Sequence, residues 1–205
     1  MQHQDDKRTP QQRMQQRKNA LWTERSSMDS HAQDIADFLL PRAVRFTETD
    51  RNNGGQDKYN NIIDETGTQA HGVLEAGLMA GMTSPARPWV KLATPDADLM
   101  EYAPVKEWCS KVTKKMLQIF AKSNTYRAFR SCYGQLGGFG VAANIVVDNF
   151  DNVLHNYPLA FGQYALGLNH LGQVDTVYRT MTKTVGQLVP EFGYDNCSLT
   201  VRNAW

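Results

Sequence analysis

The spacing of apolar and polar positions predicts helices over most of the first two thirds of the chain. The clearest helix covers 104–124, where apolar residues recur at i, i+3, i+4 and i+7 and form one stripe. That stripe consists of Val105, Trp108, Cys109, Val112, Met116, Ile119 and Phe120. A second helix is predicted from Thr125 to about Leu136. A third covers 66–82 and must end near Thr83, because Pro85 disfavours helical geometry in the residue before it.

The pattern changes after Gly140, where short runs typical of strands begin. Residues 144–148 form a β-branched run, and 163–168 and 174–183 flank a loop of turn residues at 169–172, which predicts a hairpin. A short helix is predicted over 184–192, and 199–205 has the character of a strand. Helices first and an antiparallel sheet later indicate an α+β fold.

The first 27 residues differ from the rest in being polar and rich in Gln and charge. They carry six basic against three acidic side chains, so the sequence predicts a basic tail or a lone polar helix over 1–27. A helix with Ser30 as its N-cap is expected over 30–40, and Asn52 to Gly55 predict a loop. The α+β domain is expected over 28–205, incomplete at its C-terminus, because the final strand-like residues have no polar tail.

The helix over 66–82 is unusual in its small residues, Ala76, Gly77, Ala80 and Gly81. A glycine in a helix interior costs about 1 kcal/mol relative to alanine. Two glycines four residues apart therefore predict that another element packs very close to this helix. Past the break at Pro85, Trp89 opens a β-favouring WVKL run, which predicts a strand that carries a large aromatic anchor. Asp64 is placed to cap the helix that starts near Thr66.

Charge becomes informative only locally, because the net charge of the 205 residues is +1. Residues 105–133 hold seven basic side chains against one acidic. A solvated helix face, an acidic protein partner and DNA phosphates are all compatible with such an excess. The candidate contact residues are Lys111, Lys114, Lys115, Lys122, Arg127 and Arg130.

Several function classes are disfavoured by what the sequence lacks. No apolar run approaches the roughly 20 residues of a membrane span. The three cysteines and five histidines have no ligand spacing, so no metal site is expected. The glycines of 134–140 follow a helix rather than a strand, which argues against a nucleotide cofactor. No nucleophile–base set is present, so we expect no enzyme; an unrecognised enzyme that uses Asp64 or Asp96 is a remaining alternative.

Five segments, in order, resemble the head-to-tail connector, or portal, proteins of short-tailed bacteriophages. They are Asp64-Glu65-Thr66, AGLMAGMTSPARPWVKL at 76–92, Trp108 in the basic helix, SNTYRAFRSCYGQLGGFG at 123–140 and LGQVDTVYRTMTKTVGQL at 171–188. The resemblance extends from about Asp34 to the end of the chain. It singles out as structural or assembly residues Asp64, Gly77, Gly81, Pro85, Trp89 and Trp108.

The resemblance implies a structural protein with no catalytic residues and no cofactor. Portal proteins form a dodecameric ring at one capsid vertex, through which double-stranded DNA is packaged by a separate terminase and later ejected. The implied partners are further copies of the chain, the major capsid and scaffold proteins, terminase and tail adaptor proteins. The implied location is the virion, after assembly in the host cytoplasm, and the matched segments correspond to the N-terminal wing. The main alternative is a DNA-binding accessory module built on the basic helices of 105–133.

Overall fold

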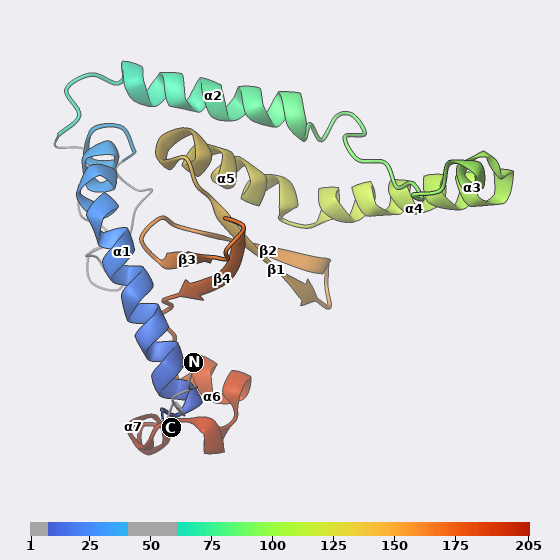
Figure 1. Ribbon diagram of the computed structural model, residues 1–205. Coiled ribbons are helices and arrows are strands. Elements are labelled where there is room, and N and C mark those ends of the chain that lie inside the picture. The colour runs from blue at the N-terminus through green and yellow to red at the C-terminus, as the bar shows by residue number, and fades with distance from the viewer. Residues whose placement is uncertain (1–7, 41–60) are drawn as a thin grey trace. The chain divides into compact units, whose positions relative to one another are not determined.

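The computed structural model describes residues 8–40 and 61–205 (Figure 1). The chain divides into two compact units, Met1–Gly162 and Gln163–Trp205. Helices precede two small antiparallel hairpins along the chain, so the expected α+β class is confirmed. The loop expected at 52–55 lies outside the described residues.

A single helix, α1 (Pro10–Phe38), occupies the polar N-terminal part of the described chain. The predicted start at Ser30 is therefore wrong. The helix begins after Thr9, whose Oγ1 accepts from the Gln12 amide (3.2 Å) while the Thr9 amide donates to Gln12 Oε1 (2.9 Å). This capping box, Pro10 in the first turn and a composition of good helix formers outweigh the lack of an apolar stripe. The domain boundary expected at 27/28 falls inside α1 and stays a prediction.

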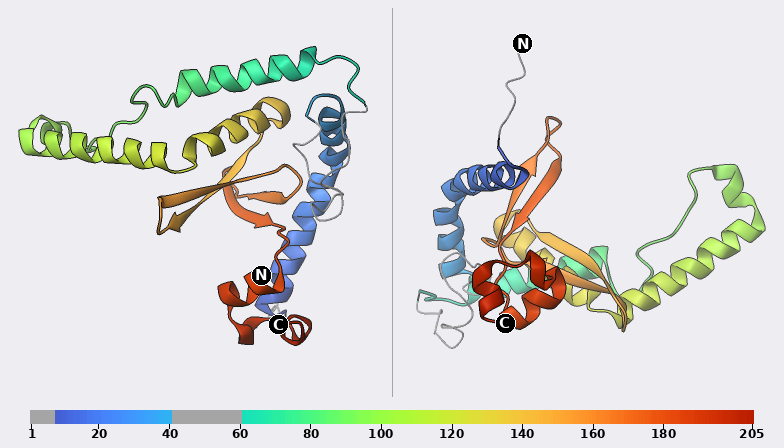
Figure 2. Two further views of the ribbon diagram at one scale, coloured as in Figure 1. Left: turned by 180° about the vertical axis from the view of Figure 1, so that it is seen from behind. Right: turned by 90° about the horizontal axis from the view of Figure 1, so that it is seen from below.

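Four further helices follow in the first unit. They are α2 (Thr66–Met82), α3 (Ala97–Glu101), α4 (Ala103–Lys122) and α5 (Thr125–Phe139). Helices α2 and α5 lie side by side, and α4 leads into α5 and carries α3 at its other end (Figures 1 and 2). The predictions for α2 and α4 are confirmed. Helix α5 continues past Leu136 until Gly140 ends it with a positive φ of 72°, and the sequence did not predict α3.

The first hairpin pairs β1 (Ala143–Asn149) with β2 (Val153–Leu159) in antiparallel register, with Val146 opposite Asn156. The sequence predicted β1 but not β2. The side chain of Asn149 shapes the connecting loop, because its Oδ1 accepts from the amides of Asp151 and Asn152, both at 2.9 Å. Val153 then starts β2 with a φ of 71°. Such a left-handed conformation costs an ordinary residue about 1–2 kcal/mol.

The second unit contains the predicted hairpin as β3 (Tyr164–Leu168) and β4 (Val174–Arg179). The helix predicted at 184–192 is confirmed as α6 (Val185–Phe192). A short 3₁₀ turn η1 (Tyr194–Asn196) and α7 (Leu199–Asn203) complete the unit. The strand character expected for 199–205 is wrong, because this stretch forms α7, where Arg202 Nε donates to Cys197 O (2.9 Å) across the turn. Local β preference is weak enough for such contacts to override it.

The apolar core of the first unit is small. Ala32 and Ala36 of α1 pack with Phe161, and Phe139 and Val141 cover them. The rings of Phe139 and Phe161 stack with centroids 5.0 Å apart. Among the described residues no large side chain is completely buried. Many large apolar side chains, including Trp108 and Phe150, lie at the surface of the described chain.

Candidate functional site

Trp89 lies at the centre of an aromatic cluster at the junction of α4 and α5. Its ring stacks on Phe120 with centroids 5.7 Å apart and meets the edge of Phe129 at 5.8 Å. Its indole Nε1 donates to Tyr126 Oη at 3.2 Å. The Trp89 side chain is half-buried. Trp89 therefore anchors the chain after Pro85 to the two basic helices, as a core residue does.

The segment that carries Trp89 differs from the sequence prediction. Residues 88–94 belong to no strand, so the predicted WVKL strand is wrong. The amide of Leu92 donates instead to Thr113 Oγ1 of α4 at 3.0 Å. A hydrogen bond to a side chain of α4 therefore takes the place of the expected bond to a neighbouring strand. Val and Trp fit a sheet and a helix surface equally well, because both of these environments bury one side of the segment.

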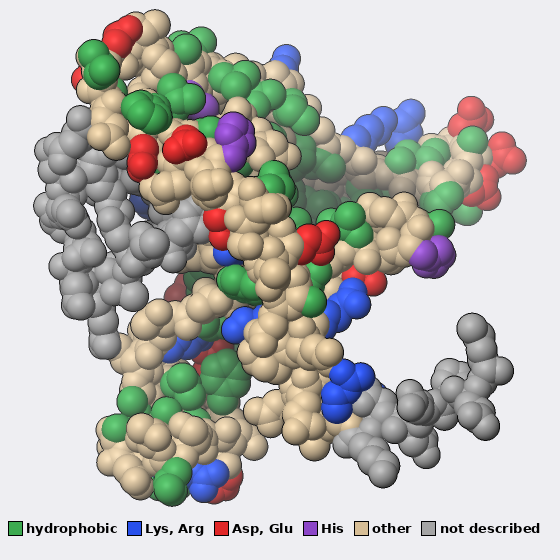
Figure 3. Space-filling view, turned by 60° about the vertical axis from the view of Figure 1, so that its left-hand side comes forward, with side chains coloured by type: hydrophobic (Ala, Val, Ile, Leu, Met, Phe, Trp, Pro, Cys, Tyr) green, Lys and Arg blue, Asp and Glu red, His purple; other side chains and the backbone are tan. Residues whose placement is uncertain are grey.

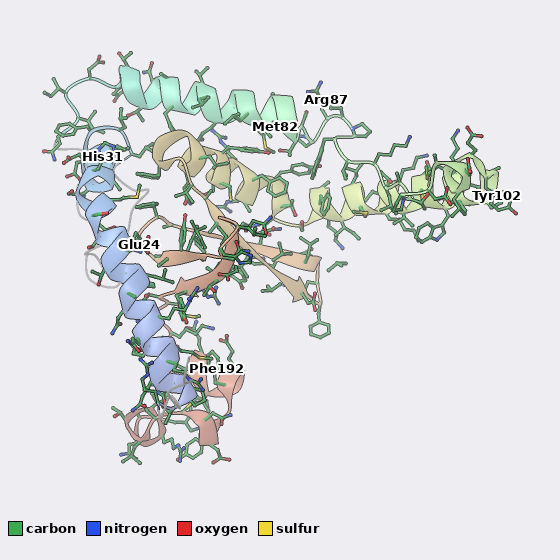
Figure 4. The ribbon with its side chains drawn as sticks, viewed as in Figure 1. Glu24, His31, Met82, Arg87, Tyr102 and Phe192 are labelled. Atoms are coloured by element: carbon green, nitrogen blue, oxygen red, sulfur yellow. The ribbon has the colours of Figure 1, made fainter. Side chains whose placement is uncertain are left out.

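Arg87 caps the C-terminal end of α2, just after the proline break. Its Nη2 donates to the carbonyls of Ala80 (2.9 Å) and Gly81 (3.0 Å). Figure 4 labels Arg87 beyond Met82, the last residue of α2. A guanidinium here both satisfies two terminal carbonyls and meets the negative end of the helix dipole. Pro85 itself is exposed in the turn.

The two glycines expected to permit close packing face open space. A Cβ built on Gly77 or Gly81 would have no atom of residues 8–40 or 61–205 within 4 Å, so the expected close packing is not made by the described part of the chain. The close approach lies on another face, where α2 meets α5. A Cβ on Gly137 would lie 2.9 Å from Leu74 Cδ2, and one on Gly134 would overlap Glu75 Oε1.

Polar contacts hold the same α2–α5 interface. His71 Nε2 donates to the carbonyl of Gly134 at 2.8 Å. Glu75 of α2 lies 3.4 Å from Arg130 Nε of α5 and 3.6 Å from His71 Nδ1. The glycines of α5 therefore serve helix packing, because they leave room for the side chains of His71, Leu74 and Glu75.

These two glycine environments predict opposite responses to alanine. Gly77→Ala is expected to stabilise the chain by about 1 kcal/mol, because the position is an open helix interior. Gly134→Ala should lose that gain or destabilise, because Glu75, which is held by Arg130 and His71, must move. Urea denaturation followed by circular dichroism measures both. Equal stabilisation by the two substitutions would contradict the packing described here.

Asp64 lies one residue before Glu65, the N-cap of α2, so the predicted cap position differs by one residue. Its Oδ1 accepts from the amide of Thr66 (3.1 Å) and from the Thr66 hydroxyl (2.9 Å). The hydroxyl bond and then the amide bond favour the carboxylate and lower the pKa of Asp64 from its ordinary value. Asp64 is therefore a structural residue at the helix start.

The lowered pKa of Asp64 predicts a pH dependence of known sign. A depressed folded-state pKa contributes stability above the unfolded value of about 3.9, and this contribution disappears as the pH falls through the folded value. Asp64→Asn should remove this part of the acid dependence and leave the remainder. Denaturation of both proteins between pH 7 and pH 2 tests this, and parallel curves throughout would contradict it.

A polar joint that sequence reasoning missed connects the α4–α5 corner to β2. The side chain of Asn124 pairs with the backbone of Asn156 in both directions: its Nδ2 donates to Asn156 O (2.7 Å) and its Oδ1 accepts from Asn156 N (2.8 Å). The buried side chain of Asn156 donates to Thr125 Oγ1 (2.9 Å) and accepts from Asn144 Nδ2 (2.8 Å). The only available signal was Asn124 between two predicted helices.

The predicted basic contact residues are divided between two helices. Lys111, Lys114, Lys115 and Lys122 lie on α4, and Arg127 and Arg130 on α5, all exposed. Lys111 pairs with Glu107 (2.7 Å) and Arg130 with Glu75, so these two are partly engaged. Figure 3 shows basic side chains along the α4 arm and acidic ones at its α3 end, where Asp96, Asp98 and Glu101 lie.

Trp108 differs sharply from Trp89. It lies on α4 with 60% of its surface exposed, whereas Cys109 and Thr113 on the adjoining face are buried. Tyr102, at the start of α4 and labelled in Figure 4, is 63% exposed. The structure therefore assigns Trp89 to the fold and leaves Trp108 available for contact with another molecule.

The described residues offer little for catalysis or metal binding. In the ranges 8–40 and 61–205 no group of three or more His, Cys, Asp or Glu side chains is placed to hold a metal ion. Nor does any helix in these ranges have the length and apolar character needed to cross a bilayer. The residues brought together are aromatic, glycine and amide groups, which pack and position rather than react.

Comparison with known proteins identifies what this arrangement resembles. Residues 11–205 match the family described as "Bacteriophage head to tail connecting protein". The chain is 54% identical over 183 residues to the "Probable portal protein" of Bordetella phage BPP-1, covering 89% of this chain. It is 43% identical over 185 residues to the "Portal protein" of Salmonella phage epsilon15, covering 90% of it. Each alignment covers 33% of the relative, so the chain spans about a third of their length.

Proposed function

This chain belongs to the family of bacteriophage head-to-tail connecting proteins, and from that membership we propose that it forms the wing region of a portal subunit. Portal proteins are structural, so the family agrees with the expectation of a protein without enzymatic activity. The ring at the capsid vertex, its role in genome packaging and ejection, and the location in the virion are parts of the same proposal.

The observation that carries the proposal is the outward face of α2. Val73 is 72% exposed, and Ala76, Gly77, Ala80 and Gly81 beside it are all exposed. Glycine is unfavourable in a helix interior unless something needs the space. A second subunit that packs closely against this face would explain the small residues, which no described part of this chain contacts closely. Such a contact between unlike surfaces repeats until the ring closes.

Three further site residues fit this proposal because they position α2, and they do not contact the neighbouring subunit themselves. Asp64 starts α2, Pro85 ends it, and Trp89 fixes the following segment to α4 and α5. Together they hold the Gly77 face at a defined position. We propose that Trp108 contacts a partner directly, because it is exposed.

The ring is tested by measuring the mass of the gene product that contains this chain and imaging its particles. Closed rings are expected, and monomers at high concentration would count against the proposal. Gly77→Leu should prevent assembly by filling the open face. Gly186→Leu in α6 is the matched control, because a Cβ at Gly186 also meets nothing within 4 Å but lies on another helix.

The proposed partners beyond the ring are the major capsid and scaffold proteins, terminase, tail adaptor proteins and double-stranded DNA in the channel. They follow from the family and from no contact within this chain. Co-purification of each with assembled rings is the direct measurement. A ring that retains none of them would leave the ring proposal intact and remove the partner proposal.

A DNA-binding accessory module is the second candidate, favoured by the exposed Lys114, Lys115, Lys122 and Arg127. The logarithm of the binding constant falls linearly with the logarithm of the salt concentration, and each neutralised phosphate makes that slope steeper by about 0.9. Tight duplex binding that weakens steeply with salt, with no self-association, would favour this module over the ring. Binding that is weak at all salt concentrations would remove it.

A further inference from the structure

The loop end of the β1–β2 hairpin is an apolar surface between two acidic side chains. Phe150 is fully exposed (109%), and Val146 (61%) and Val153 (60%) are largely exposed. Asp148 and Asp151 are exposed beside them. We call residues 148–153 the tip.

The tip has a defined shape before it meets anything. Asn149 Oδ1 binds two successive amides of the loop, and the left-handed Val153 redirects the chain into β2. Phe150 is therefore held outward by its own loop. A preformed aromatic projection loses little conformational freedom when it binds.

A surface of complementary character runs along α4. Trp108, Val112, Lys115, Ile119 and Lys122 lie on one face by their spacing, and we call them the α4 stripe. Trp108 is exposed, Val112 and Ile119 are half-buried, and Lys115 and Lys122 are exposed. The stripe is therefore apolar along its length with a basic margin.

The two surfaces are both apolar at the centre and carry charges of opposite sign. The tip offers one large aromatic side chain between two carboxylates, and the stripe offers an indole and aliphatic side chains beside two ammonium groups. Both remain exposed in the single chain, so they do not cover each other within it. We propose that the tip of one copy docks on the α4 stripe of a second copy.

This contact deepens the proposed ring, on which it rests, by naming the surfaces that join neighbouring subunits. The tip of one copy and the stripe of the next form a head-to-tail contact. In such a pair the first copy still has a free stripe and the second still has a free tip. Repetition of that contact by a closing rotation produces a ring. Phe150 supplies the central apolar anchor, and the charges select the correct partner surface.

Charge reversal tests the pairing in the gene product that contains this chain. The stripe variant carries Lys115→Glu and Lys122→Glu, and the tip variant carries Asp148→Lys and Asp151→Lys. Each alone places like charges in contact, so the concentration needed for ring assembly should rise at least about tenfold. A mixture of the two variants should recover assembly, because every tip then has an oppositely charged stripe to meet.

The matched control reverses two lysines on another side of the same helix, Lys106→Glu and Lys114→Glu, and should assemble like the wild type. Phe150→Ala tests the apolar part and should weaken assembly by about tenfold or more. Sedimentation and imaging measure assembly, and circular dichroism confirms that each variant is folded.

Cross-linking supplies an independent measurement. Asp151→Cys and Lys115→Cys in one protein should be joined between copies by a short bis-maleimide, giving a ladder of multimers. Native Cys109 and Cys197 are buried, and burial raises the pKa of the Cys132 thiol, so the introduced thiols react first. Replacing Lys115→Cys by Lys106→Cys should abolish the ladder.

The outcomes separate this inference from the function on which it rests. Wild-type rings with charge-reversed variants that assemble like the Lys106/Lys114 control would overturn the tip contact and leave the ring in place. Loss of assembly in both variants without recovery in the mixture would also overturn it and would favour DNA or another partner for the lysines. A wild type that forms no rings at all would overturn the proposed function first.

Discussion

Replacing Trp89 by alanine is expected to lower the free energy of unfolding by about 2–4 kcal/mol. The substitution removes the ring that stacks on Phe120 and meets Phe129, and it leaves Tyr126 without the indole donor. Tryptophan-to-alanine changes in cores cost about 3–5 kcal/mol, and the half-buried position of Trp89 reduces that figure. Urea denaturation followed by circular dichroism measures the loss.

Trp108→Ala is the matched control, because the same side chain is removed from an exposed site. Its effect on stability should stay within about 0.5 kcal/mol. Its effect on ring assembly should be larger than its effect on stability, because Trp108 belongs to the α4 stripe. Equal losses of stability from the two substitutions would contradict the distinction between a core and a contact tryptophan.

Asn124→Ala is the second change expected to have a large effect. It removes both hydrogen bonds to the backbone of Asn156, a residue that is 3% exposed. Each buried polar group left without a partner costs about 1–3 kcal/mol. We therefore expect a loss of about 2–4 kcal/mol, together with loosening of β2 from the α4–α5 corner.

Asn203→Ala provides the control, because this asparagine is exposed in α7, and its loss should be below about 0.5 kcal/mol. Hydrogen exchange at the Asn156 amide supplies the local measurement and should accelerate in Asn124→Ala. If global stability falls while exchange at the Asn156 amide stays unchanged, the stabilisation by Asn124 does not act through its bonds to Asn156.

The parts of the fold that the sequence predicts are those in which one local pattern dominates. Helix α4 has a long apolar stripe, α2 has a clear proline break, and the β3–β4 hairpin has turn residues between two alternating runs. Helix α1 was predicted firmly only over its last third, and the alternatives of tail and lone helix stayed open before it, because its stability comes from a capping box and helix-forming polar residues, with few apolar contacts. Strand β2 was missed because Asn156 and Pro158 interrupt its pattern.

The candidate site was predictable in identity and less so in geometry. The sequence singled out Gly77 and Trp89, but it could not say which face of α2 meets α5. It therefore assigned the close packing to Gly77 and Gly81, whereas Gly134 and Gly137 provide it. Those choices depend on contacts between segments far apart along the chain, such as His71 with Gly134. Local spacing carries no information about them.

The Asn124 side chain has a consequence for growth of the sheet. Because it binds the N–H and C=O of Asn156, those groups point away from β1, and by alternation Pro158 presents no donor on the same side. The outer margin of β2 is thus closed to strand addition, which protects this hairpin from amyloid-like stacking there. Any strand that joins this two-stranded sheet would have to add along β1.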